Sequence, residues 1–131
     1  MARILLIDDD AEFCVFLQEV LEHAGYEVVV AHNGREGVAC YEATSIDLVI
    51  TDVLMPEQEG LETITFLQHI NPQVKIIAVS GGGLTGRMDF LYVAAALGVR
   101  RTLRKPFSQQ ELLEAVRELI QGEDEDTRPA P

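Results

Sequence analysis

The hydrophobic pattern of this chain alternates, because five short apolar runs each precede a segment in which apolar residues recur every three or four positions. The short runs are typical of strands buried on both faces, and the longer period is typical of helices. The predicted strands cover residues 3–7, 26–31, 47–52, 74–80 and 99–105. The predicted helices cover residues 11–24, a short segment ending near 42, 60–69, 87–97 and a last segment starting at 108. This alternation predicts an α/β fold with a parallel sheet covered by helices on both faces.

Local signals at the helix ends support this assignment. Asp10 can cap the N-terminus of the first helix, and Gly25 follows its last apolar residue. Ser108 and Glu111 form the Ser-x-x-Glu capping box of the last helix. Both helices are therefore predicted to begin where the hydrophobic period changes.

Polar side chains stand where four of the five predicted strands end. They are Asp8 and Asp9 after the first strand, Asp52 at the end of the third, Ser80 at the end of the fourth and Lys105 at the end of the fifth. In an open parallel sheet the binding site lies at the carboxyl ends of the strands, where the strand order reverses. We therefore expect three carboxylates, a hydroxyl and an amine at one edge of the sheet.

Three carboxylates in one place repel each other, and each raises the pKa of its neighbours. A hard divalent cation removes this conflict, and Mg²⁺ prefers oxygen ligands while it keeps several waters. Two protein carboxylates and a backbone carbonyl would suit it. The sequence therefore predicts Mg²⁺ as the cofactor at this edge.

The same set of groups suits phosphoryl transfer, which needs positioning and charge neutralisation more than covalent help. An oxygen of Asp52, held beside the metal, can attack a phosphorus atom. Lys105 and Ser80 would hold two oxygens of the transferred group, and the metal would hold a third. These three residues are accordingly the predicted catalytic residues.

Four motifs, in this order, give the chain its resemblance to the receiver domains of two-component response regulators. They are LLIDDD, DVLMPEQEG, VS at the end of the fourth strand, and LRKPF, and they span residues 4–107. The resemblance implies a flavodoxin-like, doubly wound (βα)5 fold whose five-stranded parallel sheet has the order 2-1-3-4-5. It also implies that Asp52 accepts a phosphoryl group from a phosphohistidine of a sensor histidine kinase or a histidine phosphotransfer protein.

The resemblance further implies a set of metal ligands. Asp9 would bind Mg²⁺ directly, and Asp8 would bind it partly through water. Asp52 and the backbone carbonyl of Leu54 would complete the ligands that the protein supplies.

The resemblance assigns roles on the fourth and fifth strands as well. Ser80 takes the Ser/Thr switch position, and Lys105 takes the position of the lysine that is typical of the family. The peptide bond between Lys105 and Pro106 would be cis, which is otherwise a minority state.

Two features depart from the family pattern. Thr102 stands three residues before Lys105, where many receiver domains carry Tyr or Phe, so the usual rotation of an aromatic ring cannot occur. The loop over residues 81–90 is longer than usual, with four glycines between 81 and 86. Because glycine raises backbone mobility, this loop is a candidate for carrying the conformational signal, and a simple mobile insertion is the other interpretation.

Leu54 and Gly82 would flank the acceptor without a polar group to guide water, which predicts slow autodephosphorylation.

Composition sets the remaining limits. The formal net charge of −12 argues against direct nucleic-acid binding, because phosphate repels an acidic chain. No apolar run approaches the roughly 20 residues of a membrane helix, so no membrane contact and a cytoplasmic location are predicted. Residues 1–121 are predicted to form one domain, and residues 122–131 an acidic, disordered tail. Cys14 and Cys40 are expected to be reduced and to pack as small apolar side chains.

Several functions fit these features. A stand-alone receiver would signal by phosphorylation-dependent contact with an output protein, or would pass the phosphoryl group on. It would not be an enzyme beyond self-phosphorylation from small donors and slow autodephosphorylation. A pseudo-receiver that binds partners without phosphate is the alternative, although no acid, acceptor or lysine is missing.

Two enzyme-like or cofactor-binding functions fit less well. A phosphohydrolase with an aspartyl phosphate would usually carry a second acid two residues after Asp52, where Leu54 stands. A flavodoxin-like cofactor binder would carry a phosphate-binding loop where this chain has three acids. The cognate kinase, the output protein and the oligomeric state are left open by the sequence.

Overall fold

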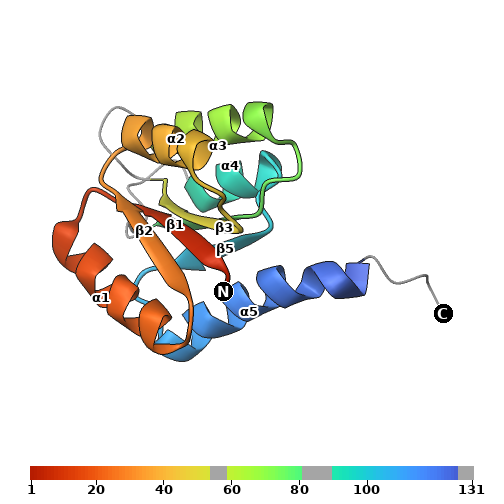
Figure 1. Ribbon diagram of the computed structural model, residues 1–131. Coiled ribbons are helices and arrows are strands. Elements are labelled where there is room, and N and C mark those ends of the chain that lie inside the picture. Colours follow the sequence, from red (N-terminus) through yellow and green to blue (C-terminus); the bar gives the residue numbers. More distant parts are fainter. Residues whose placement is uncertain (54–58, 81–89, 127–131) are drawn as a thin grey trace.

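The computed structural model describes residues 1–53, 59–80 and 90–126, and strands alternate with helices along the whole of this part of the chain (Figure 1). The strands are β1 (Arg3–Ile7), β2 (Glu27–Ala31), β3 (Leu48–Asp52), β4 (Ile76–Ser80) and β5 (Arg101–Arg104). The helices are α1 (Ala11–His23), α2 (Gly34–Ala43), α3 (Glu59–Ile70), α4 (Phe90–Ala96) and α5 (Gln109–Asp126). All ten predicted elements are therefore present.

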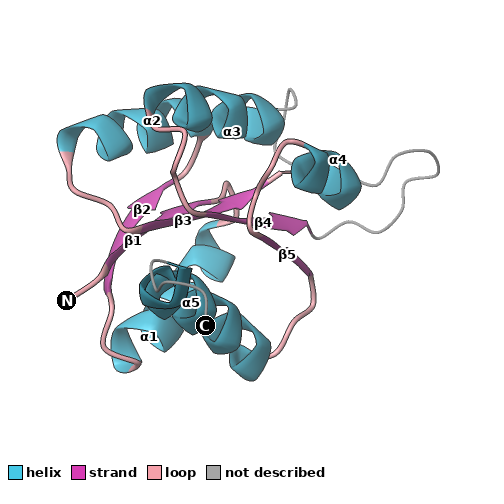
Figure 2. Ribbon diagram, turned by 90° about the vertical axis from the view of Figure 1, so that its right-hand side faces the viewer, coloured by secondary structure: helices cyan, strands magenta, loops and turns pink. Residues whose placement is uncertain are grey.

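The five strands form one parallel sheet in the order β2-β1-β3-β4-β5. Figure 2 shows α1 and α5 on one face of this sheet and α2, α3 and α4 on the other. Both the doubly wound fold and the strand order expected from the sequence are confirmed. The order reverses between β1 and β3, so a crevice is expected where these two strands end.

Burial explains why the central strands are continuous apolar runs. Every residue of β3 and β4 is buried, whereas β2 and β5 at the sheet edges are largely half-exposed. Alternate residues of β1 face opposite helix layers, with Ile4 and Leu6 packed toward α1 and α5, and Leu5 and Ile7 packed toward α2 and α3. Each buried aliphatic side chain of this kind stabilises the fold by about 1.5–3 kcal/mol.

The helix starts follow the predicted capping residues. The Asp10 carboxylate accepts a hydrogen bond from the Phe13 backbone N–H at 3.1 Å. At the start of α5 the Glu111 backbone N–H donates to the Ser108 hydroxyl at 3.0 Å, and the Ser108 N–H donates to the Glu111 carboxylate at 3.4 Å. Gly25 follows α1 with a φ of 100°, a left-handed conformation that glycine adopts without strain.

The last helix is longer than predicted. It passes through Gly122 and ends at Asp126, within the segment that the sequence predicted to be a disordered tail. One glycine costs a helix only about 1 kcal/mol relative to alanine, and the glutamates that follow are good helix formers. Residues 127–131 of the predicted tail lie outside the described residues.

Among the described helices, none combines the length and the apolar character that crossing a bilayer would require.

Gly60, in the first turn of α3, lies against the end of β3. A Cβ atom at this position would meet the Asp52 carbonyl oxygen, the Val53 Cα at 2.5 Å and the Val53 carbonyl carbon at 2.8 Å. All of these are backbone atoms, which cannot rotate away as a side chain can. The absence of a side chain at Gly60 therefore lets α3 pack directly behind Asp52.

We expect Gly60→Ala to lower the free energy of unfolding by about 3 kcal/mol, because the methyl group must push α3 away from β3. Urea denaturation followed by circular dichroism measures this change. Gly25→Ala is the matched control, since its Cβ would have no heavy atom within 4 Å. It should cost only about 1–2 kcal/mol, through its left-handed backbone. Equal losses in the two variants would contradict the steric explanation.

Candidate functional site

The acids after β1 differ in exposure although they are neighbours in sequence. Asp8 is buried with 1% of its surface exposed, whereas Asp9 is exposed. The Asp8 backbone N–H donates to the Ala31 carbonyl at 3.1 Å, and its carboxylate accepts from the Asp10 N–H at 2.9 Å. These bonds fix Asp8 at the carboxyl end of the sheet, while the side chain of Asp9 is open to solvent.

Asp52 is the last residue of β3, with 6% of its surface exposed. It is level with Val79 on the neighbouring strand β4, and the Val53 N–H donates to the Val79 carbonyl at 2.9 Å. Carboxylate oxygens of Asp8, Asp9 and Asp52 all lie within 4.8 Å of one another. The predicted gathering of three acids at the point where the strand order reverses is therefore present in the structure.

Lys105 joins the two buried acids. Its Nζ lies 3.1 Å from Asp8 Oδ2 and 3.3 Å from Asp52 Oδ2, and 19% of its side chain is exposed. Its backbone N–H donates to the Ser80 carbonyl at 2.8 Å, which ties the end of β5 to the end of β4. The peptide bond from Lys105 to Pro106 is cis, as the family resemblance implied.

The charges of these groups depend on one another. Burial raises the pKa of Asp8 above 3.8 and the Asp52 charge adds to this, although the Asp10 N–H and the Lys105 ammonium act in the opposite direction. Burial alone would lower the pKa of Lys105, but the charges of Asp52 and Asp8 outweigh it and raise the pKa above 10.5. Lys105 is therefore charged at neutral pH. Its stabilising contribution is complete below pH 10.5 and is lost as the pH rises through its higher folded-state pKa.

Ser80 lies on β4, which is beside β3, and Thr102 lies on β5, the edge strand on the far side of β4. Ser80 ends β4, is buried with 4% exposed, and is level with Arg104 in the register of β5. Its position at the same sheet edge as Asp52 and Lys105 agrees with the prediction. Thr102 is half-buried in β5 and is level with Ala78.

Other predicted features fall on parts of the chain that are not described. Leu54, whose carbonyl was predicted as a metal ligand, lies outside the described residues. The same holds for Gly82 and for residues 81–89 of the glycine-rich loop. The predictions of slow autodephosphorylation and of a signalling role for this loop therefore stay predictions.

Phe13 is a contact of the site that the sequence did not reveal. Its sequence spacing places it on the apolar face of the first helix, and it packs beside the core that α1 and α5 share. The Lys105 ammonium also lies over its ring, 3.8 Å from the centroid. Phe107 meets the same ring edge-on, at a centroid distance of 5.8 Å and an interplanar angle of 80°.

Cys14 lies beneath the site and fits its predicted role as a buried, reduced residue. It is 2% exposed, and its thiol donates to the Asp8 carbonyl at 3.4 Å. Burial, together with the charges of Asp8 and Asp10, raises the pKa of the thiol to about 11. Cys40 is also a free thiol but is only half-buried.

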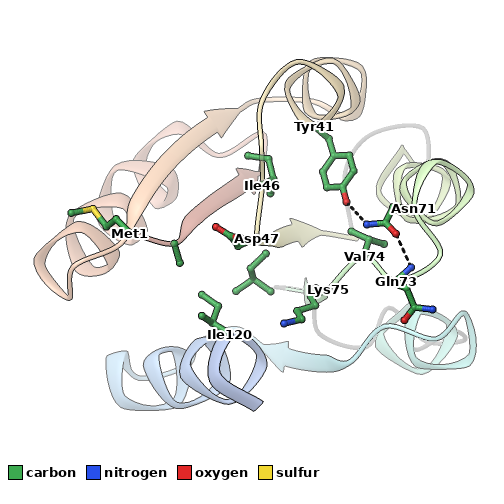
Figure 3. A pocket seen from close by; sticks show the side chains of 11 residues that line it. Met1, Tyr41, Ile46, Asp47, Asn71, Gln73, Val74, Lys75 and Ile120 are labelled. Carbon is green, nitrogen blue, oxygen red and sulfur yellow. Dashed lines mark hydrogen bonds between the residues drawn. The ribbon is translucent and has the colours of Figure 1, made fainter. Parts of the chain in front are cut away.

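A separate hollow of about 460 Å³ lies at the opposite edge of the sheet, beside the amino ends of the strands (Figure 3). Its wall includes Asp47 and Lys75, which directly precede β3 and β4, together with Tyr41, Asn71 and Ile120. The Asn71 amide donates to the Tyr41 hydroxyl at 3.0 Å. Because its described wall contains a single carboxylate side chain, that of Asp47, this hollow does not offer the group of carboxylates that a divalent cation requires.

The three acids suit a hard cation by their chemistry. They offer several carboxylate oxygens within a small radius, and two of the three acids are buried. A single lysine contacts two of the three acids and carries one positive charge, so it neutralises only part of their combined negative charge. Oxygen ligands with an open side, here at Asp9, are the environment that Mg²⁺ occupies in proteins. The residues present therefore fit Mg²⁺.

Comparisons with known proteins agree with this geometry. The family profile described as "Response regulator receiver domain" matches residues 4–117. The chemotaxis protein CheY of Thermotoga maritima is 35% identical over 115 residues, which cover 87% of this chain and 93% of CheY. The transcriptional regulatory protein CpxR of Escherichia coli is 34% identical over 120 residues, which cover 92% of this chain. The match covers 50% of CpxR, so the chain spans about half the length of that relative.

Solved structures resemble the chain over nearly its whole length. A response regulator receiver domain protein from Clostridium thermocellum superposes with a TM-score of 0.86 at 31% identity, covering 97% of this chain and 100% of the other. The response regulator TrrA of Thermotoga maritima, solved in complex with Mg²⁺ and BeF, gives a TM-score of 0.79 at 30% identity. That match covers 91% of this chain and 99% of TrrA. The chain therefore belongs to the response-regulator receiver domain family.

Proposed function

We propose that this chain is a phosphorylation switch in which Asp52 accepts a phosphoryl group in a Mg²⁺-dependent reaction. The donor is a phosphohistidine of a sensor histidine kinase or of a histidine phosphotransfer protein. One observation carries the proposal: a single lysine bridges two buried carboxylates, Asp8 and Asp52, beside a third acid at the crevice of the sheet. Stability alone does not explain this cluster, because burial removes water from the Asp8 and Asp52 carboxylates and so costs free energy.

Asp52 acts as the nucleophile. One of its carboxylate oxygens forms a bond to phosphorus while the bond from phosphorus to the donor's imidazole nitrogen breaks. The nitrogen keeps the electron pair of that bond and takes up a proton. β3 holds Asp52 at its end and Gly60 lets α3 pack behind it, so the attacking group is positioned before the donor arrives.

Asp8, Asp9 and Asp52 would hold the Mg²⁺ ion. When bound, the ion supplies positive charge close to the oxygens of the phosphoryl group. Lys105 lies 3.3 Å from the Asp52 carboxylate and can donate to an oxygen of the phosphoryl group, and Ser80 offers a hydroxyl at the end of the next strand. Fixed donors at the places where charge develops usually lower the barrier of such a reaction more than any other single effect.

The phosphorylated form acts on an output protein or passes the phosphoryl group on. We infer no turnover of a separate substrate, so the chain is a switch with at most self-phosphorylation from small donors and slow autodephosphorylation. The proposal includes a cytoplasmic location, where ATP is available to a histidine kinase. It includes no direct nucleic-acid contact by this domain, since a net charge of −12 repels phosphate.

The test is the intact mass of the native protein after incubation with acetyl phosphate, with Mg²⁺ or with a chelator. We expect one added phosphoryl group in Mg²⁺ and none in the chelator. Borohydride reduces an acyl phosphate to an alcohol, so treated protein should carry homoserine at position 52 in a peptide map. Addition at a different residue would contradict the assignment of the acceptor.

The alternative is a pseudo-receiver that binds its partner without phosphate. It predicts no mass increase, even where a Mg²⁺-dependent rise in melting temperature shows that the acids bind the ion. The pair of measurements therefore separates the two functions.

A further inference from the structure

We propose that Phe13 is a positioning residue that holds the Lys105 ammonium against Asp8 and Asp52 through the face of its ring. This inference rests on the proposed phosphoryl transfer, in which Lys105 is a donor. It adds a part of the site that lies on α1, outside the strand ends that carry the acids, the hydroxyl and the lysine.

The contacts of Lys105 show why an extra support is useful. The lysine chain is flexible, and both of its carboxylate partners lie within 3.3 Å of the Nζ atom. The Phe13 ring meets the same ammonium at 3.8 Å from its centroid. A cation over an aromatic face is attracted by the ring's negative charge distribution, and this attraction is stronger in a partly desolvated place.

The Phe13 ring is positioned by two residues, one that precedes it and one that follows it in the sequence. The Asp10 cap accepts the Phe13 N–H at 3.1 Å and so fixes the start of α1. Phe107 packs edge-on against the ring at 5.8 Å, an arrangement that aromatic pairs prefer. Lys105 and Phe107 are two residues apart and contact the same ring. The segment after β5 is therefore fastened to the start of α1.

This arrangement limits the positions that the ammonium can take. With the ring centroid at 3.8 Å and two carboxylates within 3.3 Å, the Nζ atom is kept beside Asp52, where it can meet an oxygen of a transferred phosphoryl group. A leucine at position 13 would fill much of the same space without offering an aromatic face. A tyrosine would keep the ring.

The first measurement is the chemical shift of the Lys105 Hε and Cε nuclei in the native protein. Protons above a ring face are shielded, so we expect an upfield shift in native protein and in Phe13→Tyr, and its loss in Phe13→Leu. An unshifted Lys105 signal in the native protein would overturn the contact, whether or not the leucine variant folds.

The second measurement is the rate of phosphoryl uptake from acetyl phosphate. We expect Phe13→Leu to be about fivefold slower, which corresponds to about 1 kcal/mol. Phe13→Tyr should stay within twofold of the native rate. The matched control is Phe16→Leu, because Phe16 lies on the same helix with 45% of its surface exposed and should leave the rate unchanged.

A purely structural role for Phe13 predicts a different outcome. It predicts that Phe13→Leu lowers the Mg²⁺-induced rise in melting temperature along with the rate, whereas a positioning role leaves that rise unchanged because the ring supports the lysine. If native protein and Phe13→Leu take up the phosphoryl group at the same rate, the inference about Phe13 is wrong and the proposed function is unaffected. Native protein that takes up none overturns the proposed function, and the inference falls with it.

Discussion

The Asp52→Ala variant should take up no phosphoryl group from acetyl phosphate in Mg²⁺, while it stays folded. In the proposed reaction, alanine removes the oxygen that attacks phosphorus, and neither Asp8 nor Asp9 can replace it at the end of β3. Asp8 is held by the Asp10 N–H and by Lys105, and Asp9 lies on the exposed side of the crevice. The fold should tolerate the change, because removing one of three neighbouring acids also removes repulsion that raises the pKa of Asp8.

Intact mass spectrometry measures the uptake, and circular dichroism shows whether the variant is folded. Asp47→Ala is the matched control, because this aspartate directly precedes the same strand at the other edge of the sheet. Its carboxylate accepts the Arg3 N–H at 2.7 Å, far from the crevice, so uptake should equal that of the native chain. Continued uptake by Asp52→Ala would place the acceptor elsewhere.

The Lys105→Ala variant should accept a phosphoryl group about 100-fold more slowly, the effect of removing one fixed donor from a transition state. Lys105 is partly buried, lies 3.3 Å from Asp52, and carries its charge throughout the neutral range because its pKa is raised. A buried ammonium acts on developing charge more strongly than an exposed one, since less water screens it. Asp52 keeps its position in this variant, so uptake should be slow but still dependent on Mg²⁺.

The rate of mass increase at saturating acetyl phosphate checks this prediction. Lys75→Ala is the control, because Lys75 borders the hollow at the opposite edge of the sheet. A loss of similar size in both variants would indicate a general effect of charge on the approach of an anionic donor. A loss confined to Lys105→Ala supports a local role.

Much of the fold could be predicted because the central strands have two buried faces. β3 and β4 carry no exposed residue, so their apolar runs are continuous and easily recognised. The caps at Asp10 and at Ser108 were equally visible, since each satisfies backbone groups with its own side chain. The strand at the edge was harder: β5 is limited to Arg101–Arg104, three residues shorter than predicted, because an edge strand has weaker apolar constraints.

The site was predictable as a set of residues but not as a set of contacts. Strand ends meet at one edge of a parallel sheet, and this rule is enough to bring Asp8, Asp52 and Lys105 together. It cannot say that Asp8 is buried while its neighbour Asp9 is exposed, because this depends on how α1 leaves the sheet. It also cannot separate a phenylalanine that only fills the core from Phe13, which in addition faces an ammonium. Both uses follow the same 3.6-residue period.

The separation of Asp8 from Lys105 along the chain has a consequence for the synthesis and folding of the protein. These residues pair across 97 positions, and the lysine directly follows β5, the edge strand that pairs with β4 in the described sheet. The strands β1 and β3, whose ends carry Asp8 and Asp52, leave the ribosome before β5. A chain that stops before residue 105 therefore lacks the lysine of the site. A partly synthesised chain can therefore hold the acids without their ammonium. In the proposed function, the full rate of phosphoryl uptake is therefore reached only after Lys105 has joined the acids, so an immature copy competes weakly for the donor.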